Sequence, residues 1–553
     1  MITDRLLFIV PPYITYTSFV KPDFNERVVF KKNGSFGSLV TEMPLGILSI
    51  SSYLKKNINS IEIKFIDFNV VLNKMVDFSF GSFIELFYDF FSKKEWIDFK
   101  PTVVGISTLF APAYHNMIDL GQAVRDLFPS ALIVAGGGIP TNMFNQIFKE
   151  SYCFDALCYG EGEKPFLGLM MAEDKVYFLE NNLSWITNKK IKNKQSFEHD
   201  FVQDLDEIPF LDYDILNIKD YGINPILSLF PLEEERKRKG MSVMISRGCP
   251  HRCSFCSSYT VHGRKMRYYS MKRVKEDFKR LKDKYGAETL IFFDDHLMAD
   301  KKRVYEIFDI IKNLRLTAFF PNSLALYALD RKMLEALKSI GVNNLVLSVE
   351  SGSNRVLKEI MHKPLNLSIV KRVVDDCRQL GIVSDVSILI GLPGETKQDI
   401  EDARSFLKTL NGSWFRISMA TPLVGSEMLD VCLKNNYIKG DYINCDFKRA
   451  IVETEDFTPE YIQEKAYFLN LELNFVENND FKLGNYAVAL KGFENTIRVK
   501  NDHAFAYYFA AKCCLTMNLD EKYREYKIKY EKILKESVFW RNLVNQFVLV
   551  SLK

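Results

Sequence analysis

The chain has 553 residues, of which 47% are hydrophobic, and its 73 Lys and Arg residues against 70 Asp and Glu give a formal net charge of +3. This length suggests roughly three or four domains. The near balance of charge excludes a general attraction to nucleic acid or to an anionic membrane. No segment reaches the ~18 consecutive apolar residues of a transmembrane helix. The ten cysteines are too scattered for a secreted disulfide framework, so we expect a cytoplasmic protein.

Residues 1–165 alternate short apolar runs with helical stretches, which predicts an open, doubly wound parallel sheet. The expected strands are Leu6–Val10, Ile61–Ile66, Val103–Ser107, Ala131–Ala135 and Ala156–Cys158, and the expected helices include Pro44–Lys56 and Ala113–Leu127. Ligands bind beyond the carboxyl ends of such strands. Two glycine-rich turns, Gly136–Gly138 and Gly160–Glu163, fall at those ends. Neither is a G-x-G-x-x-G motif opening the first helix, so ordinary dinucleotide binding is not indicated.

An aromatic stretch lies inside this region, from Asp77 to Trp96. Phe83, Phe87, Phe90 and Phe91 recur there at helical spacing among charged residues. This pattern predicts a packed amphipathic helix. A contact with a membrane surface or with an apolar substrate is the alternative.

Residues 166–235 are polar and irregular, which indicates a linker with a small subdomain. A second series of strands and helices follows over 236–445. Its expected strands are Ser242–Ser246, Thr289–Phe293, Ala318–Phe320, Asn344–Val349, Asp385–Ile390 and Trp414–Met419, separated by helices that include Met271–Tyr285 and Ser368–Leu380. Six strands with crossovers predict an open, partial (βα)6 barrel.

Helical patterns dominate residues 446–553. The segments Gly484–Phe493 and Asp502–Tyr508 resemble a tetratricopeptide helix pair in their small and aromatic positions. Such a pair serves either as a structural cap or as a protein-docking surface. We favour the cap, because so short an array offers little concave surface.

Three cysteines, Cys249, Cys253 and Cys256, lie in one short segment directly after the strand-like run Met241–Ser246. One loop with this spacing can bind three corners of an iron–sulfur cube and leave the fourth iron open. Structural zinc is an alternative, with His251 or His262 as fourth ligand, although the spacing matches no common zinc pattern. A redox pair would need only two of the three cysteines.

The C-x3-C-x2-C segment after a first strand resembles the signature of the radical S-adenosylmethionine (SAM) superfamily. The resemblance implies a [4Fe-4S] cluster whose open iron is chelated by SAM, with Phe255 near the adenine. It continues along the chain. Asp294 and Asp295 match residues that orient the SAM amino group; Ser348 and Glu350 match a motif near its ribose and carboxylate; Gly391 lies in a motif that contacts adenine.

The N-terminal region resembles a cobalamin-binding domain fused ahead of a radical SAM barrel. The residues that carry this resemblance, and that it implies for cobalamin binding, are Pro12, Pro44, Leu45, Gly46, Ser107, Thr108, Gly136, Gly137, Gly138, Gly160, Glu161 and Gly162. The D-x-H-x-x-G motif that supplies a cobalt ligand in other cobalamin proteins is absent, since neither His115 nor His296 fits it. We therefore expect a lower cobalt face without histidine, shielded by a barrel or linker side chain.

The resemblance implies a methyltransferase. One SAM methylates cobalamin, and another is cleaved to a 5′-deoxyadenosyl radical that removes hydrogen from an unactivated carbon, which then takes the methyl group. A cobalamin-dependent cyclase or rearrangement enzyme is the first alternative, and a non-catalytic metal-binding interaction protein is a distant one. Methylthiolation is argued against, because no cysteine precedes Cys153. Cys432, Cys445, Cys513 and Cys514 are too dispersed for an auxiliary cluster, and the last two indicate buried helix packing.

The partners of such an enzyme are a substrate and an electron donor. We expect a small-molecule, lipid or peptide substrate and a donor such as flavodoxin or ferredoxin. The 44 phenylalanines hint at an apolar substrate such as a lipid or polyketide.

Overall fold

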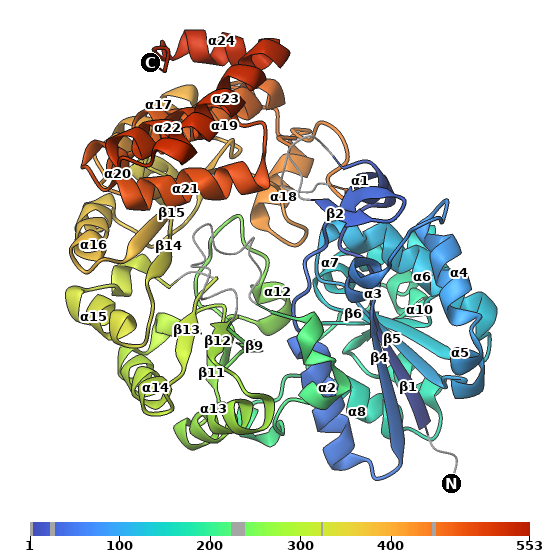
Figure 1. Cartoon of the computed structure of the whole chain (residues 1–553). Helices are drawn as coiled ribbons and strands as arrows, with labels where there is room; N and C mark the ends of the chain where they lie inside the picture. Colours follow the sequence, from blue (N-terminus) through green and yellow to red (C-terminus); the bar gives the residue numbers. More distant parts are fainter. Residues whose placement is uncertain (1–3, 23–27, 223–237, 322–323, 445–448, 553) are drawn as a thin grey trace. The chain divides into compact units, whose positions relative to one another are not determined.

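The computed structural model describes residues 4–22, 28–222, 238–321, 324–444 and 449–552 (Figure 1). The chain divides into two compact units. The first comprises residues 1–224, 239–296 and 421–451, and the second comprises 225–238, 297–420 and 452–553. The predicted boundary after residue 235 and Cys445 lie outside the described residues, and the four-part division of the chain stays a prediction. Over the described ranges no helix is long and apolar enough to cross a membrane.

The first unit is built on a six-stranded sheet of order β4-β1-β5-β6-β7-β8. Its strands are β4 (Ile61–Asp67), β1 (Asp4–Val10), β5 (Val103–Ser107), β6 (Leu132–Gly136), β7 (Ala156–Cys158) and β8 (Trp185–Ile186). All neighbours pair in parallel except β8, which runs antiparallel to β7. The predicted parallel sheet is confirmed. The edge strand β8 and a hairpin of β2 (Val28–Lys31) and β3 (Gly34–Gly37) were not predicted.

Both faces of this sheet are buried. Alternate residues of each strand point to opposite sides, and each side packs into an apolar cluster. On β1, Leu7 and Ile9 join one apolar cluster, while Leu6, Phe8 and Val10 join another. The first cluster lies under α3 (Phe68–Lys74), α4 (Phe83–Phe91), α6 (Tyr114–Leu127) and α7 (Gly138–Glu150), and the second lies under α2 (Leu45–Asn57) and α8 (Glu163–Met171). The central strands are therefore enclosed by helices on both sides.

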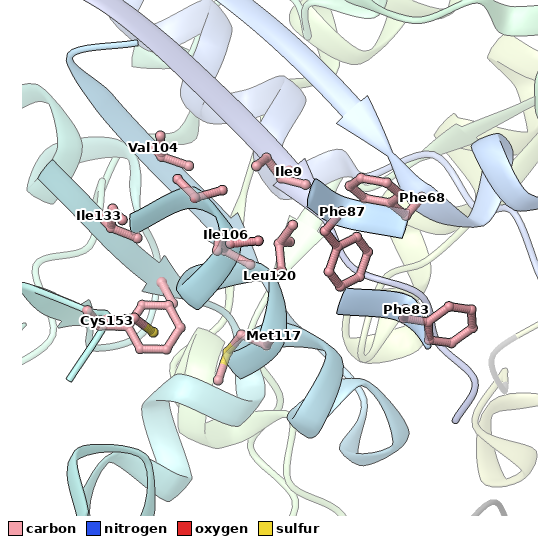
Figure 2. Close-up of a cluster of buried hydrophobic side chains, with 14 of the residues drawn as sticks. Ile9, Phe68, Phe83, Phe87, Val104, Ile106, Met117, Leu120, Ile133 and Cys153 are labelled. Carbon is pink, nitrogen blue, oxygen red and sulfur yellow. The ribbon is translucent and has the colours of Figure 1, made fainter. Parts of the chain in front are cut away.

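The aromatic stretch forms α4, which packs on the first of these faces (Figure 2). The Ser82 side chain caps the helix by accepting a hydrogen bond from the backbone N–H of Glu85. Phe83, Phe87 and Phe91 are fully buried, and Phe87 contacts Phe68 edge-on with ring centroids 4.7 Å apart. The packing interpretation of this stretch is confirmed, because its aromatic side chains fill the core.

The cysteine segment comes after β9 (Gly240–Val243), which pairs in parallel with the later strand β12 (Thr289–Phe292). The predicted strand Ser242–Ser246 was placed too late, since the strand ends at Val243. Asp294 Oδ1 accepts hydrogen bonds from the Ile245 backbone N–H and the Ser246 hydroxyl, which holds this backbone out of the ladder. The chain then forms β10 (Ser246–Arg247), which pairs antiparallel with β11 (Arg267–Tyr268). α13 (Met271–Tyr285) follows, as predicted.

The second unit contains the parallel sheet β14-β15-β16, with β14 (Asn344–Glu350), β15 (Val383–Ile390) and β16 (Trp414–Met419), and a short strand β13 (Thr317–Phe319). The helices between these strands are α14 (Lys301–Asn313), α15 (Arg331–Ser339), α16 (Leu367–Gln379) and α17 (Lys397–Lys408). The strands lie where the sequence pattern predicted them. The predicted α/β class is confirmed.

The described residues beyond 458 are helical. Their main helices are α19 (Pro459–Leu471), α21 (Tyr486–Val499), α22 (Ala504–Thr516), α23 (Asp520–Glu536) and α24 (Val538–Gln546). The shorter helices of the chain are α1 (Tyr16–Val20), α5 (Lys94–Phe99), α9 (Lys175–Asn181), α10 (Asn188–Lys192), α12 (Tyr259–His262), α18 (Glu427–Lys434) and α20 (Asn479–Lys482). Cys513 and Cys514 are fully buried in α22, which confirms their role in helix packing. The tetratricopeptide resemblance stays a prediction.

Candidate functional site

A cavity of about 290 Å³ opens at the carboxyl ends of the first unit's strands. Val10, Ser107, Gly136 and Cys158, which end β1, β5, β6 and β7, all line it. This is the edge where open parallel sheets bind ligands. Nine residues predicted for cobalamin line the cavity: Pro44, Leu45, Gly46, Ser107, Gly136, Gly137, Gly160, Glu161 and Gly162. Pro12, Thr108 and Gly138, also predicted, are not among the lining residues.

Two glycines of the predicted turns have backbone conformations and surroundings that exclude a side chain. Gly137 has φ +103°, and a Cβ there would lie 2.6 Å from the backbone oxygen of Thr108. Gly160 has φ +86°, and a Cβ there would collide with the His199 ring. Both glycines line the cavity, so a side chain at either position would distort the turns that form its wall.

Apolar and aromatic side chains form much of the remaining wall. Leu109 and Phe110 follow β5 and are 49% and 43% exposed, so their surfaces are available to a ligand. Tyr13, which follows β1, packs edge-on against Phe110 with ring centroids 5.1 Å apart. Glu42 also lines the wall, and burial raises the pKa of its carboxyl. These residues come from the N-terminal sheet region. Leu211 of the predicted linker and Met244, Tyr269 and Phe293 of the predicted barrel also line the cavity, and which side chain shields the cofactor stays a prediction.

The cysteine loop is closed at its base. The Cys249 backbone N–H donates to the Gly263 carbonyl at 3.3 Å, and the Cys256 N–H donates to the Cys253 carbonyl at 3.1 Å. None of the three cysteines forms a disulfide bond, and each has intermediate exposure. Burial raises the pKa of Cys249 to about 11, with smaller contributions from Cys256, Asp295 and Cys253. The three thiols and Asp295 therefore share one neighbourhood, and Phe255, between the last two cysteines, is half-buried.

The two aspartates after β12, Asp294 and Asp295, differ in their contacts. Asp294 uses Oδ1 to anchor Ile245 and Ser246, and burial raises its pKa to about 7. The Oδ2 atoms of both aspartates are buried without a hydrogen-bond partner over the residues described, and Asp295 lies near Cys249. Because Asp294 already anchors the backbone through Oδ1, Asp295 is the better placed of the pair to meet a ligand's ammonium group.

The histidines considered for zinc have other partners. The His251 ring packs against His296 with centroids 4.7 Å apart. His262 Nδ1 lies 2.8 Å from Glu161 Oε1. His262 lines the cavity and Glu161 belongs to the glycine turn after β7, so this contact joins the cysteine-loop region to the turn.

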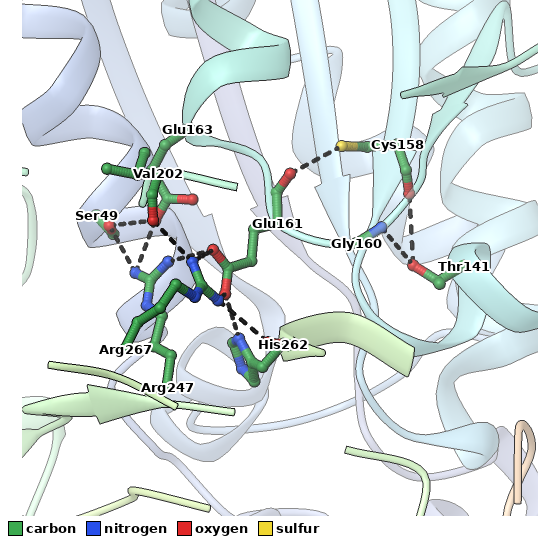
Figure 3. Close-up of polar contacts among 10 residues, drawn as sticks. All are labelled: Ser49, Thr141, Cys158, Gly160, Glu161, Glu163, Val202, Arg247, His262 and Arg267. Atoms are coloured by element: carbon green, nitrogen blue, oxygen red, sulfur yellow. Dashed lines mark hydrogen bonds and ion pairs between the residues drawn. The ribbon is translucent and has the colours of Figure 1, made fainter. Parts of the chain in front are cut away.

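Glu161 is the centre of a buried ion network (Figure 3). Its carboxylate forms a bidentate pair with Arg267, at 2.6 and 2.9 Å, and an ion pair with Arg247 at 3.0 Å. Burial alone would raise the pKa of Glu161, but Arg247, His262 and Arg267 outweigh it and hold that pKa well below the ordinary range. Glu161 is therefore a carboxylate that is fully committed to protein partners.

A second carboxylate extends the network. Glu163 Oε1 lies 2.7 Å from Arg247 Nη2 and accepts the hydroxyl of Ser49, which in turn accepts from Arg247 at 3.1 Å. Ser49, Glu163, Arg247 and Arg267 were not predicted as site residues, and His262 was considered only as a zinc ligand. Two acidic residues in one glycine turn and two arginines that flank the cysteine loop could have indicated ion pairs. However, the paired residues lie 84 to 106 positions apart in the sequence, so no local pattern connects them.

In the second unit, Ser348 and Glu350 lie near the carboxyl end of β14. The ladder with β15 is irregular between them, and Glu350 adopts φ +68° although it is not glycine. Its buried carboxylate lies 3.6 Å from Lys363 Nζ. Strained backbone at a buried acidic residue is typical of functional sites.

Gly391 directly follows β15 and has φ +89°. Glu395 Oε2 accepts from the backbone N–H groups of Gly391, at 2.6 Å, and Leu392, at 3.1 Å. Burial raises the pKa of Glu395 to about 8 despite these bonds. The glycine turn is thus fixed by a carboxyl group that the sequence analysis did not assign.

Two family models match the chain, one over the region of the N-terminal sheet and one over the region that contains the cysteine loop. Residues 39–170 match the B12 binding domain, and residues 243–407 match the radical SAM superfamily. The chain combines a B12-binding domain with a radical SAM domain. This combination identifies it as a radical SAM enzyme.

Curated relatives include methyltransferases and a cyclase. An uncharacterized methyltransferase of Pyrococcus horikoshii is 29% identical, over 67% of this chain and 78% of that protein. Cytidylyl-2-hydroxyethylphosphonate methyltransferase of Streptomyces wedmorensis is 27% identical, over 68% and 76%. The anaerobic magnesium-protoporphyrin IX monomethyl ester cyclase of Rubrivivax gelatinosus is 25% identical, over 60% and 58%.

Two solved structures share the fold. OxsB, a cobalamin-dependent SAM radical enzyme solved with aqua-cobalamin and SAM, has a TM-score of 0.60 at 14% identity, covering 100% of this chain and 82% of that one. TsrM from Kitasatospora setae, solved with cobalamin and a [4Fe-4S] cluster, has a TM-score of 0.58 at 13% identity, covering 97% and 100%. At this identity the likeness concerns the fold.

Proposed function

We propose that this radical SAM enzyme is a cobalamin-dependent methyltransferase acting on an unactivated carbon. The observation that carries the proposal is the continuity of the cavity wall within the first unit. The glycine turns of the sheet line one part of it, while Arg247, Val261 and His262, which flank the cysteine loop, line another. A cofactor in this cavity would lie beside the loop that holds the cluster.

The cluster ligands in this proposal are the thiols of Cys249, Cys253 and Cys256, which form no disulfide bond. When bound, the cluster supplies an electron for cleavage of a carbon–sulfur bond of SAM, and cobalamin supplies a methyl group. The chain's own residues bind and orient. Asp295 offers an unpartnered carboxylate oxygen for the SAM amino group, and Phe255 offers an aromatic surface for its adenine. Ser348, Glu350 and Gly391 of the second unit complete the proposed SAM set.

The cavity residues fit a corrin cofactor. Leu109 and Phe110 present apolar surface to the cavity, and Gly46 on its wall has open space where a side chain would begin. His262 is the histidine that lines the cavity, and its Nδ1 already contacts Glu161. Shielding of the cofactor from water is a main contribution of such a wall.

The deciding experiment is anaerobic reconstitution of the full chain with iron, sulfide and hydroxocobalamin, followed by SAM and dithionite. The proposal expects both 5′-deoxyadenosine and S-adenosylhomocysteine, and it expects flavodoxin or ferredoxin to replace dithionite. If the reconstituted enzyme forms no 5′-deoxyadenosine, the proposed radical reaction is wrong.

A cyclase or rearrangement enzyme is the second candidate, favoured by the relative in Rubrivivax gelatinosus whose name is that of a cyclase. It predicts 5′-deoxyadenosine without S-adenosylhomocysteine in the same assay. A small molecule, a lipid or a peptide fits either reaction as substrate. We also propose that the C-terminal helices act as a structural cap, which a truncation before Pro459 would test through the yield of folded enzyme.

A further inference from the structure

The buried ion network connects the cavity to both arms of the cysteine loop. Arg247 lies two residues before Cys249 on one arm, and His262 and Arg267 follow the loop on the other. The pairing of β10 with β11 brings these arms together, and the bond from Cys249 N–H to the Gly263 carbonyl closes the loop above them. The Glu161 carboxylate contacts side chains of both arms at once.

Glu161 is itself fixed to the cavity wall. It lies between Gly160 and Gly162, which both line the cavity. The Gly160 N–H donates to Thr141 Oγ1 at 3.1 Å, and the Cys158 thiol contacts the Glu161 carbonyl at 3.7 Å (Figure 3). Because the turn is held on both sides, a ligand that presses on either glycine would act on the Glu161 backbone and, through it, on the carboxylate.

Four members of the network are almost completely buried. Glu161, Glu163, Arg247 and Arg267 are each at most 6% exposed. The segment after the sheet covers them, since the Val202 carbonyl accepts from Arg267 at 2.9 Å and the Phe201 ring lies 4.3 Å from the Arg267 guanidinium carbon. Two carboxylates balance two guanidinium groups here, so removal of one charge leaves an uncompensated buried charge.

The Glu161 carboxylate has no capacity left for a cofactor. Oε1 contacts Arg267 and His262, and Oε2 contacts Arg267 and Arg247. Any effect of Glu161 on cofactor binding therefore has to pass through its partners. We propose that Glu161 is a positioning residue that couples occupancy of the cobalamin cavity to the geometry of the cluster loop.

This inference rests on the proposed function and has a thermodynamic consequence. If the network joins the two sites, the cluster strengthens cobalamin binding, and cobalamin stabilises the cluster by the same factor. The test is the dissociation constant of hydroxocobalamin, measured by absorbance titration on the full chain with its cluster and after anaerobic chelation of the iron. For the wild type we expect about fivefold tighter binding, or more, when the cluster is present.

The decisive variant is Glu161→Gln, which keeps the size of the side chain and removes its charge. We expect its ratio of dissociation constants, without and with cluster, to fall close to one. A merely structural residue would weaken both measurements together and leave that ratio unchanged. The matched control is Glu173→Gln, an exposed residue of the same unit, which should keep the wild-type ratio.

The second variant is Arg247→Lys, which keeps the charge but cannot pair with Glu161 and Glu163 through a planar fork. It should also lower the ratio, and it decides the matter if Glu161→Gln does not fold by circular dichroism. A wild-type ratio of one, or an unchanged ratio in the folded variant, would overturn the coupling. If the cluster-loaded wild type binds no hydroxocobalamin at all, the proposed function itself fails.

Discussion

Glu161 and Glu395 are buried carboxyl groups that the chain stabilises in opposite ways. Arg247, Arg267 and His262 surround Glu161 and hold its pKa well below the ordinary range against the effect of burial. Glu395 accepts two backbone N–H bonds, and burial still raises its pKa to about 8. Glu161 is therefore ionised at neutral pH, whereas Glu395 keeps its proton at pH values below about 8.

Glu395→Gln should remove a pH dependence of stability. Between pH 4.5 and about 8 the unfolded chain has released this proton and the folded chain keeps it, so the free energy of unfolding falls as pH rises through that window. The loss is on the order of 5 kcal/mol, at about 1.4 kcal/mol per pH unit. Melting temperatures at pH 5 and 8 check this: the advantage of the wild type over the variant should shrink at pH 8, whereas the exposed control Glu359→Gln should show no such change.

Cys253→Ala should abolish the cluster, because it removes one of three proposed ligands. Iron and sulfide analysis after anaerobic reconstitution, together with visible absorbance, measures the loss. Cys514→Ala is the matched control. Because Cys514 is buried in α22, its substitution should leave the cluster content unchanged. Full cluster content in Cys253→Ala would contradict the ligand assignment.

At the scale of elements, the same residue types serve different purposes according to their position. The phenylalanines of α4 form core, while Phe110, in the loop after β5, presents its ring to the cavity. Composition could not separate these uses. The helical spacing of Phe83, Phe87 and Phe91 could, because it places them on one face that has to be buried.

Phe87→Ala should destabilise the first unit by about 3–5 kcal/mol, since it leaves a cavity in a packed aromatic cluster. Phe87 is fully buried, whereas Phe30 is 85% exposed. Phe30→Ala is therefore expected to change the free energy of unfolding by less than about 0.5 kcal/mol. Chemical denaturation of both variants gives the comparison, and equal effects would refute the packing role of α4.

At the scale of the molecule, the chain forms two compact units that do not follow sequence order. Residues 239–296 and 421–451 belong to the unit that contains the sheet and its cavity, although 297–420 lie between them in sequence. The predicted SAM residues are divided accordingly. Asp294 and Asp295 lie with the cysteines in the first unit, and Ser348, Glu350 and Gly391 lie in the second.

This division predicts that calorimetric unfolding departs from a single two-state transition. Hydroxocobalamin at 100 times its dissociation constant should stabilise the unit that contains the cavity by about 2.7 kcal/mol. The transition of the second unit should move less. A single transition that shifts as a whole would contradict the prediction.

The strands of the sheet could be predicted because each is a short run of apolar residues, which is a local property of the sequence. The strand before the cysteines was placed two to three residues late, because Met244 and Ile245 continue the apolar pattern while Asp294, far along the chain, withdraws their backbone from the ladder. The three cysteines could be proposed as cluster ligands from the sequence, since their spacing within one loop needs no tertiary information.

The sequence by itself determined the fold class, the cysteine loop and the glycine turns, because each depends on residues that are close together along the chain. Only the tertiary structure decided which charged groups meet. Glu161 pairs with Arg267 across 106 residues, and no local pattern distinguishes these two side chains from other acidic and basic residues. Burial then makes that pairing obligatory, because an isolated charge in the interior would be strongly destabilising.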